Sequence, residues 1–553
     1  LEVDERVLAD GQIHTPVDID QVKSQAQALL DAGCEAVCVF FINAYANTAN
    51  EQAAVAAVRA MWPNPHVTAA SEVLPEIREF ERCSTATLNA ALQPVVGSYL
   101  TRLETDLRGQ GFEGELLIVQ SNGGVMSRQT ACDVPVRTAL SGPAAGVMAC
   151  SAIARAAGYP NVMTGDMGGT SFDVSLVAHG EAALAAQTSI EFGLVVRSPM
   201  IQIETIGAGG GSIASVDAGG MLQVGPESAG SNPGPACYGR GNTRPTVTDA
   251  NLVTGRLNPH RFLGGEFDLD LKLATQAIEQ RIAKPLGLSV MDAALGILRI
   301  ADAKMSFAVR AITMQRGYDP RKFAMVVFGG GGPLHGMAIA RELHVPRVIV
   351  PPQPGHFSAL GMLMTDLRQD FVQTKILDYA SLTPLVLENL FKDLEQQALK
   401  SLQAEGHALD SIVLHRTLDM RYLGQEYTVR VPVPSSLPNA AALQALRLHF
   451  DELYETRYGH AAPDQSGELV NLRLTALGHV VKPSFASLQD KRIPAAVTQR
   501  HRPVVFPGVG QVDCPVLQRA ELQPGQVIAG PAVIEEYAST TILHPGDSAV
   551  FHV

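Results

Sequence analysis

Residues 165–174, Gly-Asp-Met-Gly-Gly-Thr-Ser-Phe-Asp-Val, constrain the fold of this chain more than any other segment. A short apolar stretch precedes them and strand-like residues 174–177 follow, so the sequence predicts two strands joined by a tight turn. Glycine adopts positive φ at no steric cost and lets backbone N–H groups approach an anion closely. We therefore expect a β-hairpin whose tip is bare backbone.

The side chains around this turn suit a phosphate group and its metal ion. Thr170 and Ser171 add hydroxyl donors, while Asp166 and Asp173 flank the turn and are suited to hold Mg²⁺ directly or through its waters. This chemistry indicates ATP binding and phosphoryl transfer. The segment is not a P-loop, because the pattern G-x-x-x-x-G-K-[ST] leading into a helix is absent. An ordinary glycine-rich turn is the alternative.

Two further glycine loops are candidates for ligand contact. Gly329–Gly332 lies between an apolar strand at 324–328 and a helix that starts near Leu334. Its backbone could press against an adenine or ribose, with the helix N-terminus facing a phosphate; a sharp strand-to-helix turn is the alternative. Gly209–Gly211 is not a dinucleotide fingerprint, because Ser212 takes the place of a third glycine and β structure is expected after it. A phosphate or substrate loop stays possible there.

Composition bounds the class of protein. A chain of 553 residues with 46% hydrophobic and 18% charged content can build large cores, and its length predicts about three or four domains. The net charge of −13 argues against a nucleic-acid or anionic-membrane partner. No run of about 18 apolar residues predicts a transmembrane helix. Seven cysteines without a C-x-x-C pair fit reduced thiols in the cytoplasm.

The order of predicted elements favours an α/β fold. A helix at 20–32, a strand at 36–42 and a helix at 49–61 alternate near the N-terminus, and a long helix is expected at 291–315. A charge-richer helix at 386–405 opens a last region, in which strands alternate with one helix near 440–457. We expect three domains, at residues 1–160, 161–380 and 381–553.

Two histidines and one cysteine lie beside glycine turns, where a metal ligand or a nucleophile would be plausible by residue type. His335 and His356 have no partner at metal-ligand spacing, so structural roles are expected. Cys237 has no His/Asp constellation that would activate its thiol, so a nucleophilic role is not expected.

Taken together, eight segments in this order and spacing resemble the A subunit of the hydantoinase/oxoprolinase family. Each segment alone is weak, but the match runs nearly the whole length of the chain. The segments are Ser71–Arg82, Ser121–Gly124, Ser141–Val147, Asp166–Val174, Thr205–Ser212, Asn232–Gly239, Thr246–Asn251 and Phe328–His335.

The resemblance implies an actin-like ATPase core, made of two RNase-H-like halves, with a C-terminal α+β domain. By that analogy the hairpin at Asp166–Asp173 is a phosphate loop and Gly329–Gly332 is the adenosine loop. Family members couple ATP hydrolysis to the opening of a lactam or cyclic imide such as N-methylhydantoin, 5-oxoproline or caprolactam. Others activate a ketone for carboxylation, and a separate B-type subunit is often required. A heteromeric, ATP-dependent amidohydrolase is thus the first expectation.

The expected site follows residue by residue. Asp166, Asp173, Glu204 and Asp249 are the candidate catalytic residues, with Asp166 and Asp173 also holding Mg²⁺. The candidate ATP-binding residues are Gly168, Gly169, Thr170, Ser171, Gly209, Gly210, Gly211, Ser212, Gly329, Gly330, Gly331 and Gly332. The alternatives are a subunit of an ATP-dependent ketone carboxylase and a non-catalytic scaffold subunit. A small cyclic amide, a B-type partner and an oligomeric state are expected; a nucleic acid or membrane is not.

Two departures from the family pattern qualify these expectations. The family usually begins with another D-x-G-G-T hairpin, which this sequence lacks, so we expect either that a preceding chain segment supplies it or that this piece is not an ATPase alone. Leu1 is not methionine, which fits one piece of a longer or processed polypeptide. Many members carry Asp and His where this chain has Gln202 and Glu204, and a role of that pair in holding metal or substrate would predict a substrate other than hydantoin.

Overall fold

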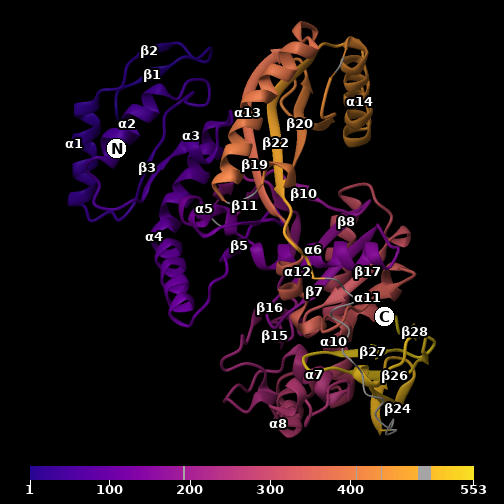
Figure 1. Ribbon diagram of the computed structural model, residues 1–553. Coiled ribbons are helices and arrows are strands. Elements are labelled where there is room, and N and C mark those ends of the chain that lie inside the picture. Colours follow the sequence, from indigo (N-terminus) through magenta and orange to yellow (C-terminus); the bar gives the residue numbers. More distant parts are fainter. Residues whose placement is uncertain (191–192, 406–407, 438, 484–499, 553) are drawn as a thin grey trace. The chain divides into compact units, whose positions relative to one another are not determined.

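The computed structural model describes residues 1–190, 193–405, 408–437, 439–483 and 500–552 (Figure 1). They form two compact units. Unit 1 comprises Leu1–Ser141, Ala185–Met200 and Thr365–Val481, and unit 2 comprises Gly142–Leu184, Ile201–Met364 and the described part of Lys482–Val553. Both units are discontinuous in sequence, whereas the domains expected at 1–160, 161–380 and 381–553 are continuous. The long strands after residue 381 therefore belong with N-terminal residues.

The N-terminal part of unit 1 is a small α/β layer. Strands β3 (Val37–Val39) and β4 (Val67–Ala69) pair in parallel, and helices α1 (Ile19–Asp31) and α2 (Ala49–Arg59) pack beside them. Asp18 caps α1 by accepting hydrogen bonds from the first-turn N–H groups. The two expected helices are therefore confirmed, each within about two residues, as is usual for helix ends.

The main sheet of unit 1 has strand order β21-β20-β22-β19-β6-β5. Its long members are β19 (Leu367–Asp378), β20 (Ile412–Tyr422), β21 (Val429–Val433) and β22 (Gly467–Gly478). The short members are β5 (Leu117–Val119) and β6 (Val125–Ser127). Strand β22 pairs with β20 on one side and β19 on the other, both antiparallel.

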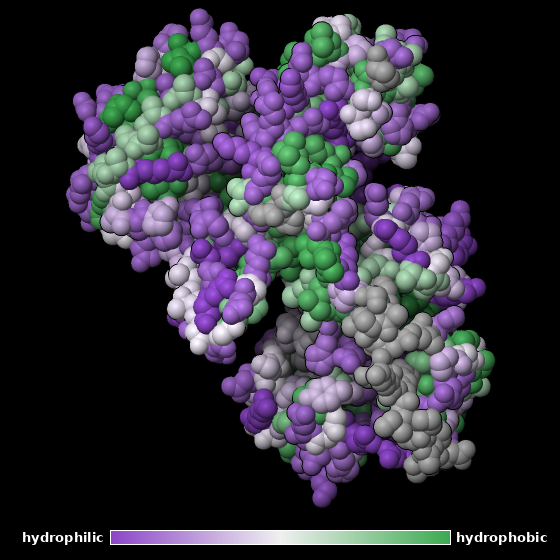
Figure 2. Space-filling view, viewed as in Figure 1, coloured by the Kyte–Doolittle hydropathy of each residue, from purple (hydrophilic) through white to green (hydrophobic). Residues whose placement is uncertain are grey.

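One face of this sheet is apolar and covered by helices. Leu418, Val431 and Leu472 point into a core shared with α13 (Pro384–Ala404) and α14 (Ala440–Tyr458). Figure 1 shows α13 running along β19 and β22, and the outward side of this helix is hydrophilic in Figure 2. Because side chains alternate along a strand, the neighbours of these apolar residues lie on the opposite face.

Unit 2 is built on a mixed sheet of order β14-β8-β7-β17-β18, in which β7 pairs antiparallel with β8 and parallel with β17. The strands are β7 (Val162–Met167), β8 (Phe172–Ala178), β14 (Ile203–Ile206), β17 (Ala324–Phe328) and β18 (Val348–Ile349). Helices α10 (Val290–Met314) and α11 (Gly332–Leu343) bury one face. Helices α6 (Ser141–Ala156) and α12 (Phe357–Leu363) bury the other. The predicted mixed α/β fold is confirmed.

The rest of unit 2 consists of smaller elements. A hairpin of β15 (Ser212–Val216) and β16 (Leu222–Ser228) is followed by α7 (Val247–Val253) and α8 (Leu271–Ile278). The C-terminal residues form a sheet of β23 (Arg500–Phe506), β24 (Gly510–Gln518), β26 (Ala532–Glu535) and β27 (Thr540–Leu543). Throughout the described part of the chain, no helix combines the length and apolar character needed to span a bilayer.

Candidate functional site

The hairpin that the sequence predicts is formed by β7 and β8. Asp166 pairs directly with Asp173, and Gly168 N donates a hydrogen bond to Ser171 O over 3.1 Å to close the tip. Gly168, Gly169 and Thr170 are exposed, and a Cβ at either glycine would have no atom within 4 Å. The tip is therefore open backbone on which an anion has free access to N–H groups.

The two aspartates lie on the same face of the hairpin because they are cross-strand partners. Thr205 donates a 2.6 Å hydrogen bond to Asp173 Oδ1, and Ser171 donates to Asp173 Oδ2 over 3.3 Å. Burial and then the charge of Asp173 raise the pKa of Asp166 to about 6, against a hydrogen bond with Ser358. Two facing carboxylates that repel each other are a favourable place for a divalent cation, which would remove the repulsion.

The loop Gly209–Gly211 packs backbone to backbone against the hairpin tip. Gly210 N donates to Gly168 O at 3.0 Å and Gly211 N to Gly169 O at 2.6 Å. A Cβ at Gly209 would lie 2.5 Å from the carbonyl carbon of Thr170, so no side chain fits there. Packing alone therefore explains why glycine occupies these positions, because the loop supports the hairpin tip from one side.

Ser212 does not present its hydroxyl to a ligand. The residue is fully buried, and its Oγ accepts from Gly209 N at 2.9 Å and donates to Gly207 O at 3.3 Å. These hydrogen bonds hold the glycine loop, and the expected ATP-binding role of Ser212 stays a prediction.

The loop Gly329–Gly332 lies against the base of the same hairpin. Gly329 has φ 76°, and a Cβ there would be 2.4 Å from both Asp166 Oδ1 and Met167 O. Gly331 N donates to Met167 O at 3.0 Å, and Gly332 begins α11. Because β17 runs parallel to β7, the strand order brings this predicted loop to Asp166.

Asp249 lies in a structural environment, and the catalytic role expected of it stays a prediction. It is fully buried and accepts hydrogen bonds from the backbone of Ala236, Cys237 and Thr246 at 3.1, 2.7 and 2.8 Å. With Thr246 it forms the capping box of α7. Its acceptor capacity is occupied by the loop that it organises, so we do not place it at the reacting end.

Glu204 lies on the opposite face of the sheet from the aspartate pair. It pairs with Val174, whereas the next residue, Thr205, pairs with Asp173 and hydrogen-bonds to it. Alternation along β14 then turns the Glu204 side chain away from Asp173. The structure does not bring Glu204 together with the other candidate residues.

The residues expected to be structural fit that expectation. His335 is fully buried, with Nδ1 2.5 Å from Asp302 Oδ1 and Nε2 3.2 Å from Asn251 Nδ2. Burial and the neighbouring Asp249 raise the pKa of the Cys237 thiol, so it is a poor nucleophile. Within the residues that the structure describes, no three His, Cys, Asp or Glu side chains gather as metal ligands.

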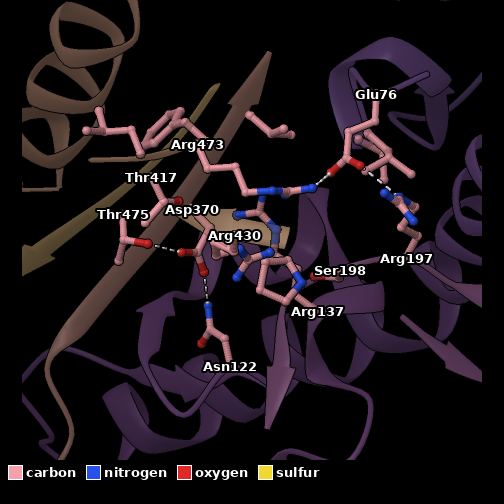
Figure 3. Close-up of a pocket in the computed structure, with 16 residues that line it drawn as sticks. Glu76, Asn122, Arg137, Arg197, Ser198, Asp370, Thr417, Arg430, Arg473 and Thr475 are labelled. Atoms are coloured by element: carbon pink, nitrogen blue, oxygen red, sulfur yellow. Dashed lines mark hydrogen bonds and ion pairs between the residues drawn. The ribbon is translucent and has the colours of Figure 1, made fainter. Parts of the chain in front are cut away.

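A second polar site, in unit 1, was missed from the sequence. It is a pocket on the polar face of the main sheet, closed by residues from outside the sheet that include Glu76, Arg137 and Arg197 (Figure 3). Four arginines line it: Arg137 from the short helix Pro135–Thr138, Arg197 after β12 (Val195–Val196), Arg430 from β21 and Arg473 from β22.

Two of these arginines are held by carboxylates. Arg473 contacts Glu76 at 2.9 Å and Asp419 at 2.7 Å, and Arg197 contacts the other oxygen of Glu76 at 2.7 Å. Burial alone would lower the pKa of Arg473, but these ion pairs raise it above its ordinary value. The alternation of polar and apolar residues at 417–422 and 471–476 is the sequence signal that predicts this face, although not what lies opposite it.

The family model "Hydantoinase/oxoprolinase" matches residues 82–371, its N-terminal region matches 1–62 and its C-terminal domain matches 381–552. The chain belongs to the hydantoinase/oxoprolinase family, as its motifs predicted.

Individual relatives narrow the comparison. The chain is 36% identical to caprolactamase subunit alpha of Pseudomonas jessenii over 98% of its own length and 78% of the relative. The crystal structure of the ATP-dependent caprolactamase from that organism has a TM-score of 0.86 at 34% identity, over 100% of this chain and 80% of the other. A nucleotide-free acetone carboxylase, studied for ATP-dependent carboxylation, has a TM-score of 0.78 at 27% identity, over 100% and 79%.

Proposed function

We propose that this chain is the A-type subunit of an ATP-dependent amidohydrolase that opens a lactam or cyclic imide ring. The observation that carries the proposal is the exposed glycine tip beside the facing Asp166 and Asp173, supported on two sides by glycine loops. Similarity to an ATP-dependent caprolactamase supports the substrate class. The actin-like core implied by the resemblance is part of this proposal.

The residues present fit Mg·ATP. The open space above Gly168 and Gly169 admits a phosphate to the backbone N–H groups, and Thr170 adds an exposed hydroxyl. Asp166 and Asp173 would hold the metal, because the raised pKa of Asp166 reports a negative charge that lacks compensation. Gly329–Gly332 would face the nucleoside part, with the N-terminus of α11 behind it.

The chemistry follows from the weak electrophilicity of an amide. ATP would supply a phosphoryl group to the amide oxygen, so that water can attack the activated carbon; the C–N bond of the ring then breaks, the ring nitrogen takes up a proton and phosphate is released by hydrolysis. The residues of this chain need only orient the phosphate at the hairpin tip and compensate its charge with N–H and hydroxyl donors. No proton transfer needs to be assigned to Asp249 or Glu204.

A ketone carboxylase subunit is the second candidate, because the acetone carboxylase structure also matches the full chain. We further propose a separate B-type partner, since the similar caprolactamase chain is named as a subunit. Both candidates use the same hairpin and differ in the acceptor.

Titration calorimetry of Mg·ATP into the full chain tests the nucleotide site. We expect saturable binding that Gly168→Ala weakens at least about tenfold, because a methyl group would occupy the anion's approach. A Cβ at Gly168 meets no neighbour, so the variant should unfold at an unchanged temperature. We expect Asp166→Asn to weaken Mg·ATP binding as well, because it removes a carboxylate that would hold the metal. Glu342→Gln, which removes the same charge at an exposed position of α11, is its control. A folded sample that does not bind Mg·ATP would contradict the proposal.

Turnover assays then separate the two acceptor classes. We expect caprolactam, 5-oxoproline or hydantoin to stimulate phosphate release in the presence of the B-type partner. Stimulation that instead requires bicarbonate and a ketone would replace the amidohydrolase by the carboxylase. ATP turnover that none of these compounds changes would contradict both the amidohydrolase and the carboxylase proposals.

A further inference from the structure

The arginine pocket of unit 1 carries more positive than negative charge. Its lining includes four guanidinium groups but only two carboxylates, Glu76 and Asp370. Including their direct ion-pair partners, Arg368 and Asp419, five guanidinium groups face three carboxylates. Figure 3 shows Arg137, Arg430 and Arg473 between Glu76 and Asp370, whereas Arg197 lies beyond Glu76.

Arg137 is the group whose charge is least compensated. Within the described residues, no hydrogen bond or ion pair reaches its guanidinium group, and burial lowers its pKa. The two carboxylates whose charge acts on Arg137, Asp370 and Glu405, already accept hydrogen bonds from other residues. Asp370 accepts from Arg368, Asn122 and Thr475, and Glu405 accepts from Thr130 and Gln369.

Arg430 is in a similar position. Its only ion pair within the described residues is with Asp419 at 3.6 Å, and that carboxylate is held more closely by Arg473 at 2.7 Å. Burial and then the like charge of Arg473 lower the pKa of Arg430. Arg137 and Arg430 are only partly buried, and a partly buried guanidinium group without a close partner gains by binding an anion.

The size of the pocket limits that anion. The cavity has a volume of about 50 Å³. One water needs roughly 10–15 Å³ on the same measure, so about three to five non-hydrogen atoms fit. A nucleotide is therefore excluded, whereas a carboxylate, bicarbonate or inorganic phosphate matches in size, and guanidinium groups bind such oxyanions through paired hydrogen bonds.

We propose that the pocket lined by Arg137, Arg430 and Arg473 in unit 1 is a binding site for a small oxyanion. Arg473 is fixed by Glu76 and Asp419 and shapes the wall, while Arg137 and Arg430 supply the charge that the anion neutralises. This site is independent of the hairpin in unit 2 and of the function proposed for it, so it is tested without nucleotide.

The test is calorimetry and thermal unfolding of the full chain at constant ionic strength, with chloride replaced by acetate, bicarbonate or inorganic phosphate. We expect saturable binding of at least one of the three, weakened at least about tenfold by Arg137→Gln. Arg102→Gln, which removes the same charge from an exposed position of α4 (Glu79–Gly109), should bind as the unchanged chain does. General salt effects on stability act on all variants alike and so cancel.

If Arg137 had a structural role instead, Arg137→Gln would unfold in chloride at a lower temperature than the unchanged chain, and this result would count against the site. If Arg137 serves an anion, Arg137→Gln should unfold in chloride at the same or a higher temperature than the unchanged chain, because it removes an uncompensated charge. Arg430→Gln should also weaken binding, and it serves as the second variant if Arg137→Gln does not fold. The proposed site would be overturned if Arg137→Gln and Arg430→Gln both bound the anion as tightly as the unchanged chain does. It would also be overturned if none of the three anions bound saturably to the unchanged chain. The preferred anion separates a planar carboxylate or bicarbonate from a tetrahedral phosphate.

Discussion

Asp166 faces Asp173 across the hairpin, and this position makes it unfavourable for stability when no cation is bound. Its pKa of about 6 lies above the ordinary value of 3.8 for an aspartate. At pH 7 the ionised form is therefore less stable in the folded chain than in the unfolded chain. The contribution of this carboxyl group to stability is complete below pH 3.8 and is lost as the pH rises through 6.

Asp166→Asn should accordingly stabilise the nucleotide-free protein at pH 7 while abolishing ATP turnover. The gain in the free energy of unfolding is on the order of 3 kcal/mol, because the pKa rises from 3.8 to about 6 and each tenfold change in proton affinity is worth about 1.4 kcal/mol. Urea unfolding at pH 7 and at pH 4 measures it, and the difference between the variant and the unchanged chain should shrink at pH 4. A variant that is less stable than the unchanged chain at pH 7 would show that the carboxylate is compensated.

Asp249 should behave in the opposite way. Asp249→Ala leaves the buried N–H groups of Ala236, Cys237 and Thr246 without an acceptor, so we expect a loss of roughly 3 kcal/mol or more. Asp217→Ala is the matched control, since Asp217 also accepts several hydrogen bonds in unit 2 but is exposed, and its loss should be much smaller. Chemical denaturation compares them. Full stability with lost turnover in Asp249→Ala would restore the catalytic role.

At the residue scale, the sequence predicted local patterns better than partners. The Asp166–Asp173 hairpin follows from ten consecutive residues, so it could be predicted. Thr246-x-x-Asp249 is itself a capping-box pattern, so the structural role of Asp249 was also visible in the sequence. The face on which Glu204 lies could not be predicted, because it depends on the register of β14 against β8.

The loop Gly209–Gly211 contacts the β7–β8 hairpin tip through backbone atoms, so there is no room for a side chain at Gly209. Gly209→Ala would place a Cβ within 2.5 Å of Thr170 backbone, so we expect the loop to shift and stability to fall by about 2 kcal/mol or more. Gly109→Ala, at the end of α4, meets no atom within 4 Å and should be neutral or slightly stabilising. Thermal unfolding and Mg·ATP affinity report both effects. Tolerance of Gly209→Ala would mean that the loop does not support the tip.

The arginine pocket shows why contacts between distant elements could not be predicted from the sequence. Its polar strand positions could be predicted from alternation in β20 and β22, but Arg137 and Glu76 come from segments hundreds of residues earlier. Their arrival depends on the chain returning to unit 1 after residue 365. Long-range pairings of this kind leave no local pattern.

For the whole molecule, the discontinuous units determine where the chain can be cut. A chain ending at residue 380 keeps β19 but loses β20, β21 and β22, and with them the long antiparallel partner of β19. We expect it to lack a stable main sheet. Hydrogen exchange of the β19 amides in this fragment and in the full chain measures the loss. Equal protection would show that residues 381–553 fold as a separate domain, as the sequence first suggested.

The central place of β22 also has a consequence for biosynthesis. β22 lies between β19 and β20 but is translated after both, so the main sheet of unit 1 closes only once residue 478 has left the ribosome. Until then the apolar faces of β19, β20 and α13 have no complete partner, and a nascent chain of this length is open to aggregation. These faces would be uncovered between the synthesis of β19 and that of β22, and a ribosome that stalls in this interval would release a product that cannot complete the main sheet of unit 1.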